Sequence, residues 1–269
     1  MQEAQIGLSK EDNDEISHRK GLRIDHLMTT PSKLNLLELQ NVPIFEQLRI
    51  EEALLRLNDE NWCILNQGSP PSIVMGISGK PETLVNTTKL EEKPIPLIKR
   101  YSGGGTVVVD HNTLFASLIF EKKVHDFPCY PEPILRWSES LYQKALDIPG
   151  FHLRENDYVI GEHKCAGNAQ YIKKERFVHH TTFLWDYETS AMDYLLYPPK
   201  TPNYRDGRSH DAFLCRLKEF LPSKEVFFNR LKETLADDYD LEVATLNPLL
   251  PLLGKPHRQT TSIEKALRQ

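Results

Sequence analysis

The chain has 269 residues, a formal net charge of −5 and four cysteines. The length fits one α/β or α+β domain, or two small ones, with enough chain to bury a sizeable core. The acidic balance, without a clustered run of basic residues, argues against a nucleic-acid-binding protein. Cys63, Cys129, Cys165 and Cys215 lie far apart and form no C-x-x-C pair. They indicate reduced thiols in an intracellular protein.

The first part of the chain is polar. Residues 1–33 lack the apolar core of a secretory signal, and their acidic run is unlike a transit peptide. The longest apolar runs fall far short of the ~20 residues that span a bilayer. We therefore expect a weakly ordered polar leader over 1–33, a folded domain over 34–255 and a polar tail over 256–269. We also expect a soluble intracellular protein, cytoplasmic or organellar, with no signal peptide, transmembrane segment or membrane partner.

Two helices and several strands are predicted in the first part of the domain. Apolar residues recur at positions 44, 45, 48 and 55, which predicts a helix over 43–58. Short buried strands follow at 62–67 and 72–78, and the polar stretch 78–96 is typical of a long loop. Strands at 106–110 and 114–123 flank a short turn, and a second helix is expected over 130–148.

The second part begins with a block of strands. Residues 151–188 alternate and are interrupted by turns, which predicts a meander. Residues 197–208 are typical of an extended surface segment. Ser209 and Ser223 each stand at the N-cap of a predicted amphipathic helix, over 209–221 and 223–240, before a last strand at 240–246. The order of elements predicts an α+β fold, with a mixed or antiparallel sheet flanked by helices.

The first candidate site is the turn RYSGGG. Arg100 precedes it, Ser102 opens it, and three glycines follow before a strand. A Walker-type P-loop is excluded, because a strand rather than a helix follows and the GK[ST] ending is missing. Two interpretations remain open: a flexible turn between strands, or a nest of backbone N–H groups that receives an anion or a carboxyl oxygen.

The second candidate is ENDYVIGEHKCAGNAQ, where Lys164 follows a tight turn. Strand alternation places Lys164 and Ala166 on one face and Cys165 on the other. Cys165 is therefore expected to be a small core residue rather than a nucleophile beside Lys164. The alternative for Lys164 is a solvated strand lysine.

The third candidate is FVHHTTFL. His179 and His180 are adjacent on a strand and face opposite ways, so they cannot share a metal ion, and no zinc-type ligand spacing occurs elsewhere. His180 and Thr182 share a face and could form a polar lining. The alternative is one solvent-exposed and one core histidine.

In this order, RYSGGGTVVVD, ND, HKCAGNAQ and VHHTTFL resemble the biotin/lipoate protein ligase superfamily, and most closely its lipoate-protein ligase A branch. The resemblance covers roughly residues 40–220. It implies a single catalytic domain of the biotin/lipoate ligase type over 34–255, with a fold like that of class II aminoacyl-tRNA synthetases. Biotin itself is a poor match, because RYSGGG replaces the GRGR-type turn of biotin ligases.

The resemblance also implies a reaction. Lipoate or octanoate is activated with ATP and Mg²⁺ to an acyl-adenylate, and the acyl group passes to a lysine of a lipoyl carrier domain. The carriers are 2-oxoacid dehydrogenases or the glycine cleavage H protein. By motif, the resemblance implies that the acyl-adenylate is bound by Arg100, Ser102, Gly103, Gly104 and Gly105, and that Lys164 stabilises the charge at its carbonyl and phosphate. It implies that Asn156 and Asp157 contact the adenosine, with Asp157 as a candidate magnesium ligand. The pocket would be shaped by Gly167, Asn168 and Ala169, and the acyl tunnel would be lined by His180 and Thr182.

Some positions depart from the family pattern. Val109 rather than a histidine precedes Asp110, and SPPSIVMGIS lacks the arginine usual in its region. Two alternatives therefore stay open: an octanoyl or lipoyl transferase that takes its acyl group from a carrier without ATP, and a non-catalytic protein that binds an acyl group or a carrier. The short stretch after residue 208 suggests a separate accessory protein. Within 202–213, Arg205, Arg208 and His210 are candidate carrier contacts, or parts of a solvated loop.

Overall fold

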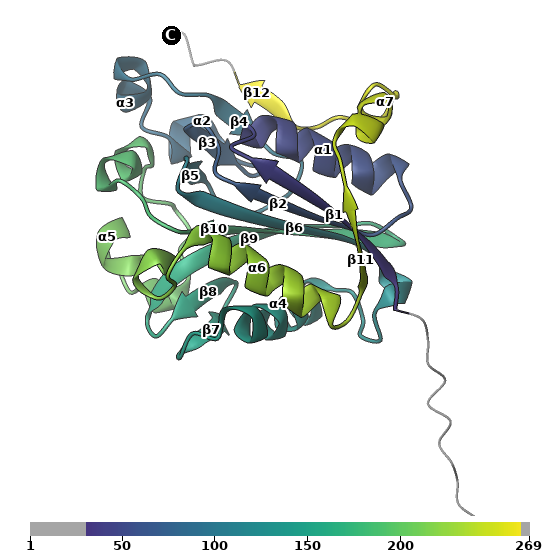
Figure 1. Ribbon diagram of the computed structural model, residues 1–269. Helices are drawn as coiled ribbons and strands as arrows, with labels where there is room; N and C mark the ends of the chain where they lie inside the picture. The colour runs from purple at the N-terminus through teal and green to yellow at the C-terminus, as the bar shows by residue number, and fades with distance from the viewer. Residues whose placement is uncertain (1–30, 265–269) are drawn as a thin grey trace, which may run out of the picture. The chain divides into compact units, whose positions relative to one another are not determined.

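The computed structural model describes residues 31–264, which form two sheets with helices on both faces of the larger one (Figure 1). The larger sheet has the strand order β11–β1–β2–β6–β10–β9–β8–β7. Its β11, β1 and β2 run parallel, and every other neighbouring pair is antiparallel. The strands are β1 (Lys33–Gln40), β2 (Trp62–Gln67), β6 (Thr113–Glu121), β7 (Phe151–Arg154), β8 (Asp157–Ile160), β9 (His163–Ile172), β10 (Arg176–Leu184) and β11 (Asp240–Ala244).

The smaller sheet carries the glycine turn. Its order is β12–β4–β3–β5, and only the β3–β4 pair is parallel. The turn RYSGGG connects β4 to β5, and its Gly104 approaches the Asn168 carbonyl of β9 in the larger sheet. The strands are β3 (Ser72–Met75), β4 (Leu97–Lys99), β5 (Val107–Val109) and β12 (Ser262–Glu264). The last of these lies in the segment that the sequence assigned to a polar tail.

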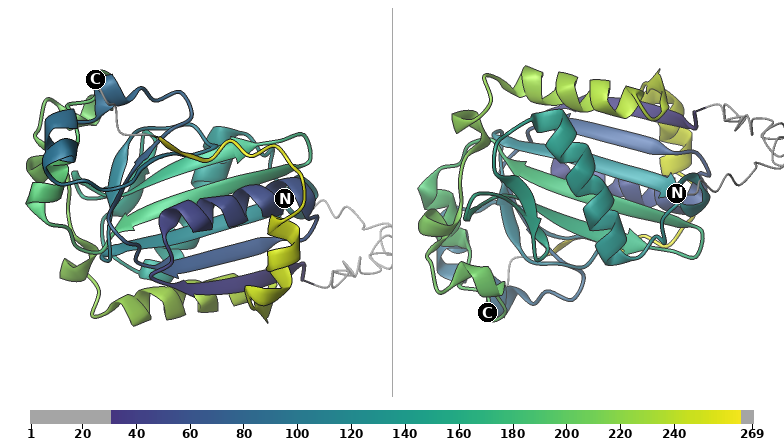
Figure 2. Two further views of the ribbon diagram at one scale, coloured as in Figure 1. Left: turned by 90° about the horizontal axis from the view of Figure 1, so that it is seen from above. Right: turned by 90° about the horizontal axis from the view of Figure 1, so that it is seen from below.

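Three long helices cover the larger sheet (Figure 2). Helices α4 (Pro131–Leu146) and α6 (Lys224–Ala236) pack on one face, and α1 (Ile44–Leu57) packs on the other together with the smaller sheet. Strand β6 shows the division, because its residues 114, 116, 118 and 120 join the α4/α6 core and its residues 115 and 119 join the α1 core. The remaining helices are short: α2 (Pro81–Leu84), α3 (Thr87–Glu92), α5 (His210–Phe213) and α7 (Leu250–Leu253).

The predicted α+β fold is confirmed. The helices expected over 43–58, 130–148 and 223–240 appear as α1, α4 and α6, and the expected meander is β7–β8–β9–β10. Ser223 caps α6 as predicted, because its hydroxyl accepts a hydrogen bond from the Val226 N–H.

The helix predicted over 209–221 is wrong. Only α5 forms after the Ser209 cap, and the chain then leaves the helix. The reason is a tertiary contact: Leu214 forms a β-bridge with Lys164, and the Cys215 N–H donates to the Lys164 carbonyl over 2.9 Å. Pairing with β9 therefore replaces the next helical turn.

Two further expectations need correction. The stretch 78–96 is not a plain loop, because α2 and α3 form inside it, with Asn86 as the α3 cap. The segment 197–208 is not wholly on the surface either. Tyr204 and Arg205 are buried, which removes Arg205 as an exposed carrier contact.

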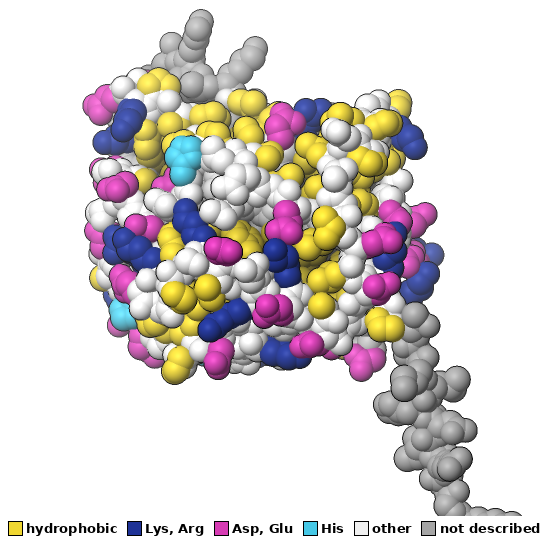
Figure 3. Space-filling model, in the orientation of Figure 1, with side chains coloured by type: hydrophobic (Ala, Val, Ile, Leu, Met, Phe, Trp, Pro, Cys, Tyr) yellow, Lys and Arg dark blue, Asp and Glu magenta, His cyan; other side chains and the backbone are white. Residues whose placement is uncertain are grey.

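Charges are dispersed on the face of the molecule seen in Figure 3, where basic, acidic and apolar side chains alternate. None of the helices within residues 31–264 is long and apolar enough to cross a bilayer.

Candidate active site

The glycine turn is held from inside by Arg100. Its guanidinium is only 6% exposed and donates to the carbonyls of Gly103 (2.7 Å) and Gly105 (2.9 Å), with a longer bond to the Val74 carbonyl. Burial lowers the pKa of Arg100 to about 10. These bonds turn the loop carbonyls inward, toward the arginine. Arg100 thus acts first as the support of the turn.

The three glycines differ in what they need. Gly104 has φ +105°, and a Cβ there would lie 2.7 Å from the Arg100 guanidinium, so only glycine fits. A Cβ on Gly103 or Gly105 would meet nothing within 4 Å. Gly103 is half-buried and Gly105 is exposed, so the space over these two residues opens to solvent and is accessible to a ligand.

Lys164 and Asp157 form an ion pair with 2.7 Å between Nζ and Oδ1, and both side chains are largely buried. The other Asp157 oxygen accepts a hydrogen bond from the Tyr204 hydroxyl (2.9 Å). Burial, followed by the charge of Asp157, raises the pKa of Tyr204, so the phenol stays protonated as the donor. The lysine is thus a fixed ammonium rather than a solvated strand lysine.

A β-bulge sets the direction of Lys164. On the β8–β9 pair, Tyr158 lies opposite Ala166 and Val159 opposite Lys164, so Cys165 is an extra residue. The expected opposition of Lys164 and Cys165 holds, because Cys165 is buried in the α4/α6 core. The expectation that Ala166 shares the Lys164 face is wrong: Ala166 joins the same core. The bulge breaks the two-residue alternation at this point.

After the bulge, Lys164 shares a face with Gly167. A Cβ on Gly167 would lie 3.3 Å from the lysine Nζ, so the missing side chain leaves room for the ammonium. Asn168 bonds through its amide to the Asn156 carbonyl, and Ala169 is buried. Asn156 itself is exposed.

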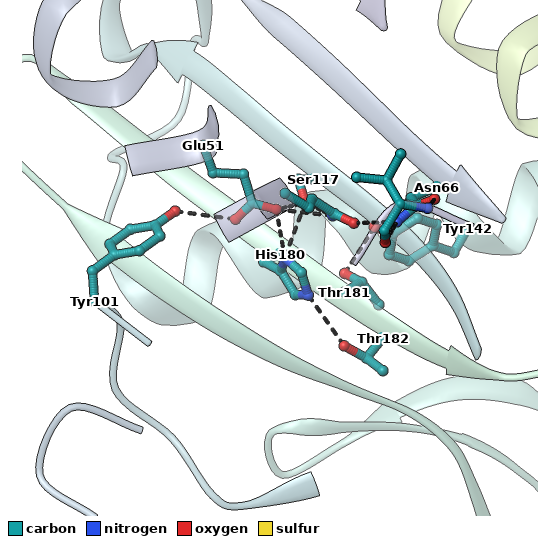
Figure 4. Close-up of polar contacts among 10 residues, drawn as sticks. Glu51, Asn66, Tyr101, Ser117, Tyr142, His180, Thr181 and Thr182 are labelled. Carbon is teal, nitrogen blue, oxygen red and sulfur yellow. Dashed lines mark hydrogen bonds and ion pairs between the residues drawn. The ribbon is translucent and has the colours of Figure 1, made fainter. Parts of the chain in front are cut away.

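A buried polar network connects the glycine turn to β10 (Figure 4). The Glu51 carboxylate, from α1, is fully buried. One oxygen accepts from Ser117 (2.6 Å) and His180 Nδ1 (2.9 Å), and the other accepts from the Tyr101 hydroxyl (3.2 Å). Burial acts to raise the pKa of Glu51. The charge and hydrogen bond of His180, with the bonds from Ser117 and Gln47, outweigh it and hold this pKa below its ordinary value.

The two adjacent histidines face opposite ways, as predicted. His180 Nε2 lies 3.2 Å from the Thr182 hydroxyl on the α1 side, so His180 and Thr182 share a face. His179 contacts Tyr158 and Thr181 on the α4 side. Burial, with His180 beside it, lowers the pKa of His179 to about 3, so this ring is neutral in the core.

The three sequence motifs meet at β9. In the β9–β10 register, Ala169 lies opposite His180 and Gly167 opposite Thr182. The Gly104 backbone approaches the same strand, because its Cβ position lies 3.7 Å from the Asn168 carbonyl. The structure therefore brings together the glycine turn, the lysine–aspartate pair and the histidine strand, which the sequence could only place in order.

Comparison with known proteins identifies this arrangement. A family model described as the lipoyl protein ligase A/B catalytic domain matches residues 43–240, well over half of the chain. The chain belongs to this family.

Its relatives in the lipoyl protein ligase A/B family carry different descriptions. The inactive lipoate–protein ligase 2 of Plasmodium falciparum (isolate 3D7) is 30% identical over 249 positions, covering 69% of this chain and 64% of that protein. Lipoate-protein ligase LplJ of Bacillus subtilis (strain 168) is 32% identical over 185 positions, covering 66% and 54%. The chain thus spans about half to two thirds of the length of these relatives.

Among solved structures, a lipoate-protein ligase A bound with ATP superposes with a TM-score of 0.66. The two sequences are 19% identical, and the superposition covers 83% of this chain and 92% of the ligase chain. The likeness establishes the fold, the class II aminoacyl-tRNA synthetase type common to these ligases.

Asp157, which the family resemblance suggested as a candidate magnesium ligand, is held between two donors in this structure. Both Asp157 oxygens are already engaged, by Lys164 and Tyr204. Within residues 31–264 no group of three or more His, Cys, Asp or Glu side chains gathers as metal ligands. We therefore assign no chemical step to a metal held by Asp157.

Two of the candidate carrier contacts, Arg205 and His210, are withdrawn from solvent, Arg205 fully and His210 in part. Arg205 is 4% exposed, and its Nη2 has no hydrogen-bond partner in the described part of the chain. Burial, followed by the charge of Arg205, lowers the pKa of His210. A cavity of about 550 Å³ opens next to His210. Of the residues singled out in the sequence, only His210, a candidate carrier contact, lines it; the full lining is Asn86, Lys89, Thr189, Met192, Asp193, Leu195, Ser209, His210 and Asp211.

The sequence interpretation missed Glu51 and Tyr101. A signal for Glu51 was present, because position 51 falls three residues after Leu48 and four before Leu55, on the predicted apolar face of α1. A carboxylate on a buried helix face needs a partner. That signal indicates a polar contact in the core, but not that His180 supplies it.

Proposed function

We propose that this domain binds an acyl-adenylate of lipoate or octanoate between the glycine turn and β9, and transfers the acyl group to a lysine of a lipoyl carrier domain. The observation that carries the proposal is the Lys164 ammonium, fixed by Asp157 and lying beside the bare backbone of Gly167. The Gly103 and Gly105 positions are open, and between them Gly104 approaches the Asn168 carbonyl, next to Gly167 on β9. An anionic ligand that lies against the backbone and near the Lys164 ammonium would fit both the open glycine positions and the fixed cation.

The chemistry of a mixed anhydride fits this arrangement. When an amine attacks the acyl-adenylate carbonyl, negative charge builds on the carbonyl and phosphate oxygens. A preorganised ammonium is among the strongest stabilising groups for such charge. The products are an amide, AMP and one proton. The Lys164 ammonium is the cationic group that supports binding of the anionic phosphate.

We further propose that the domain forms the adenylate itself from ATP and the free acid. A transferase without ATP is the second candidate. It is supported by the description of one relative as an inactive lipoate–protein ligase. A cysteine thioester at Cys165 has no support, because that thiol is buried on the opposite side of β9 from Lys164.

The experiment is lipoate-dependent exchange of labelled pyrophosphate into ATP, followed by transfer from preformed lipoyl-adenylate to a lipoyl domain. The variant is Lys164→Ala, and the matched control is Lys174→Ala, whose side chain is 94% exposed in the β9–β10 turn. Exchange in the wild type and control that disappears in Lys164→Ala supports the full proposal. Transfer without exchange overturns adenylation and leaves the transferase. Neither reaction in the wild type overturns the enzymatic proposal altogether.

A further inference from the structure

Two thiols lie next to the backbone of Lys164. Cys165 is the extra residue of the β9 bulge and is fully buried. Cys215 follows α5 and is half-buried. Neither cysteine takes part in the reaction proposed above.

The backbone holds the two cysteines side by side. Lys164 and Leu214 form a parallel β-bridge, and the Cys215 N–H donates to the Lys164 carbonyl over 2.9 Å. Continuing that register by one residue places Cys165 opposite Cys215. Neighbouring strands lie about 4.8 Å apart, which falls within the Cα separations of about 4.4–6.8 Å that a disulfide accepts.

The two thiols are also unequal in reactivity. The Cys165 Sγ lies 3.3 Å from the Tyr158 carbonyl, and the Cys215 Sγ lies 3.5 Å from the His163 carbonyl. The neighbouring Cys165 is the main influence that lowers the pKa of Cys215, whereas burial raises the pKa of Cys165 well above its ordinary value. Cys215 is thus the thiol that ionises first and that solvent reaches, as the entry point of thiol–disulfide exchange requires.

We propose that Cys165 and Cys215 form a redox modification site, which closes to an intramolecular disulfide on reaction with a low-molecular-weight disulfide. The Cys215 thiolate attacks one sulfur of the reagent, forming a mixed disulfide and expelling one thiolate. The Cys165 thiol gives up its proton to that thiolate and attacks the Cys215 sulfur, expelling a second thiolate, which takes up the proton that Cys215 released on ionising. Two protein thiols are oxidised and one reagent disulfide is reduced to two thiols.

The bond has a structural consequence. It ties the segment 209–215, which carries His210, covalently to β9 at the residue after Lys164. That segment also contacts β9 through the Leu214–Lys164 bridge, the Cys215–Lys164 hydrogen bond and the Cys215 Sγ, which lies 3.5 Å from the His163 carbonyl. Oxidation therefore fixes the position of His210 and its neighbours relative to the lysine.

The remaining cysteines provide matched controls. Cys129 is 6% exposed and its thiol lies near the carbonyls of Lys122 and Phe127. Cys63 is fully buried, and burial raises the pKa of its thiol. The Cys129→Ser variant replaces the thiol by a hydroxyl group of similar size, at a position away from Lys164.

The test treats the full chain with oxidised glutathione and reads intact mass and tryptic peptides. We expect wild type and Cys129→Ser to lose two hydrogens and yield a linked peptide pair containing Cys165 and Cys215, reversed by dithiothreitol. The Cys165→Ala variant should form only the mixed disulfide, with one glutathione on Cys215. The Cys215→Ser variant, a mild substitution at a half-buried position, should form neither the mixed disulfide nor the intramolecular disulfide. A wild type that stays reduced, or that stops at the glutathione adduct, would overturn the proposal.

Discussion

Glu51 and His180 lie 129 positions apart in the chain and meet with 2.9 Å between the carboxylate Oε1 and the imidazole Nδ1. Glu51 comes from α1 and His180 from β10, so this contact joins the helix to the centre of the larger sheet. The other Glu51 oxygen reaches Tyr101, which directly follows Arg100 at the start of the glycine turn. One buried carboxylate thereby connects two of the three sequence motifs.

Removing the Glu51 charge should destabilise the fold. In Glu51→Gln, an amide replaces the carboxylate that accepts hydrogen bonds from Tyr101, Ser117 and His180, so at least one of these donors loses its acceptor. Breaking a buried, hydrogen-bonded ion pair costs about 3 kcal/mol or more. The free energy of unfolding by urea measures this loss. Glu46→Gln, on the exposed side of the same helix, should change the value by no more than about 0.5 kcal/mol. Equal effects of the two changes would contradict the network.

Acid should destabilise the protein below about pH 6.5. The pKa of His179 is lowered from 6.5 to about 3 in the fold, so the unfolded chain binds the proton first and stability falls as pH drops through this window. One such histidine gives a slope of at most about 1.4 kcal/mol per pH unit. The slope is measured from the urea concentration at the midpoint of unfolding, determined at several pH values between 7.5 and 5. His179→Gln should flatten the slope, whereas His163→Gln, at an exposed position, should leave it unchanged.

The glycines of the turn should respond unequally to alanine. Gly104→Ala forces a side chain into φ +105° and against Arg100, and should lower the free energy of unfolding by roughly 1–3 kcal/mol. Gly103→Ala places its methyl group in open space and should leave stability within about 0.5 kcal/mol of wild type. If the open space receives the acyl-adenylate, Gly103→Ala should still weaken ligand binding. Similar melting temperatures for both variants would refute the distinction.

Glu52 should control the docking of the last strand. Its carboxylate accepts from the backbone and hydroxyl groups of Thr260 and Thr261, immediately before β12 pairs with β4. Glu52→Gln replaces an accepting oxygen by a donor, so hydrogen exchange over 260–264 should speed up at least several-fold. Glu233→Gln, exposed on α6, is the control. Unchanged exchange in Glu52→Gln would mean that strand pairing alone holds β12.

The elements predicted correctly from the sequence are those in which apolar residues recur with a strong period. Helix α1 follows from the 3.6-residue spacing of its apolar positions, and the β7–β10 meander from alternation between turns. Strand β1 was not predicted. It lies between β11 and β2, and its residues 34–37 are buried in succession, so no alternation marks it.

Local patterns failed where distant contacts decide the structure. Residues 209–221 have a cap and a helical pattern, yet bridging of Leu214 to Lys164 ends α5. The bulge at Cys165 likewise overrides strand alternation at Ala166. For the site, motifs placed Lys164, His180 and the glycines, but the partners Glu51, Tyr101 and Tyr204 come from segments that only folding brings close.

The most direct test of the acyl-adenylate site is calorimetric titration with a non-hydrolysable lipoyl-adenylate analogue, which requires no turnover. The proteins are wild type, Lys164→Ala and the exposed control Lys174→Ala. The account predicts saturable binding to wild type and control, with affinity at least about tenfold weaker in Lys164→Ala, the loss expected for a charge-assisted contact. Equal affinity in all three proteins, or no binding to the wild type, would contradict it.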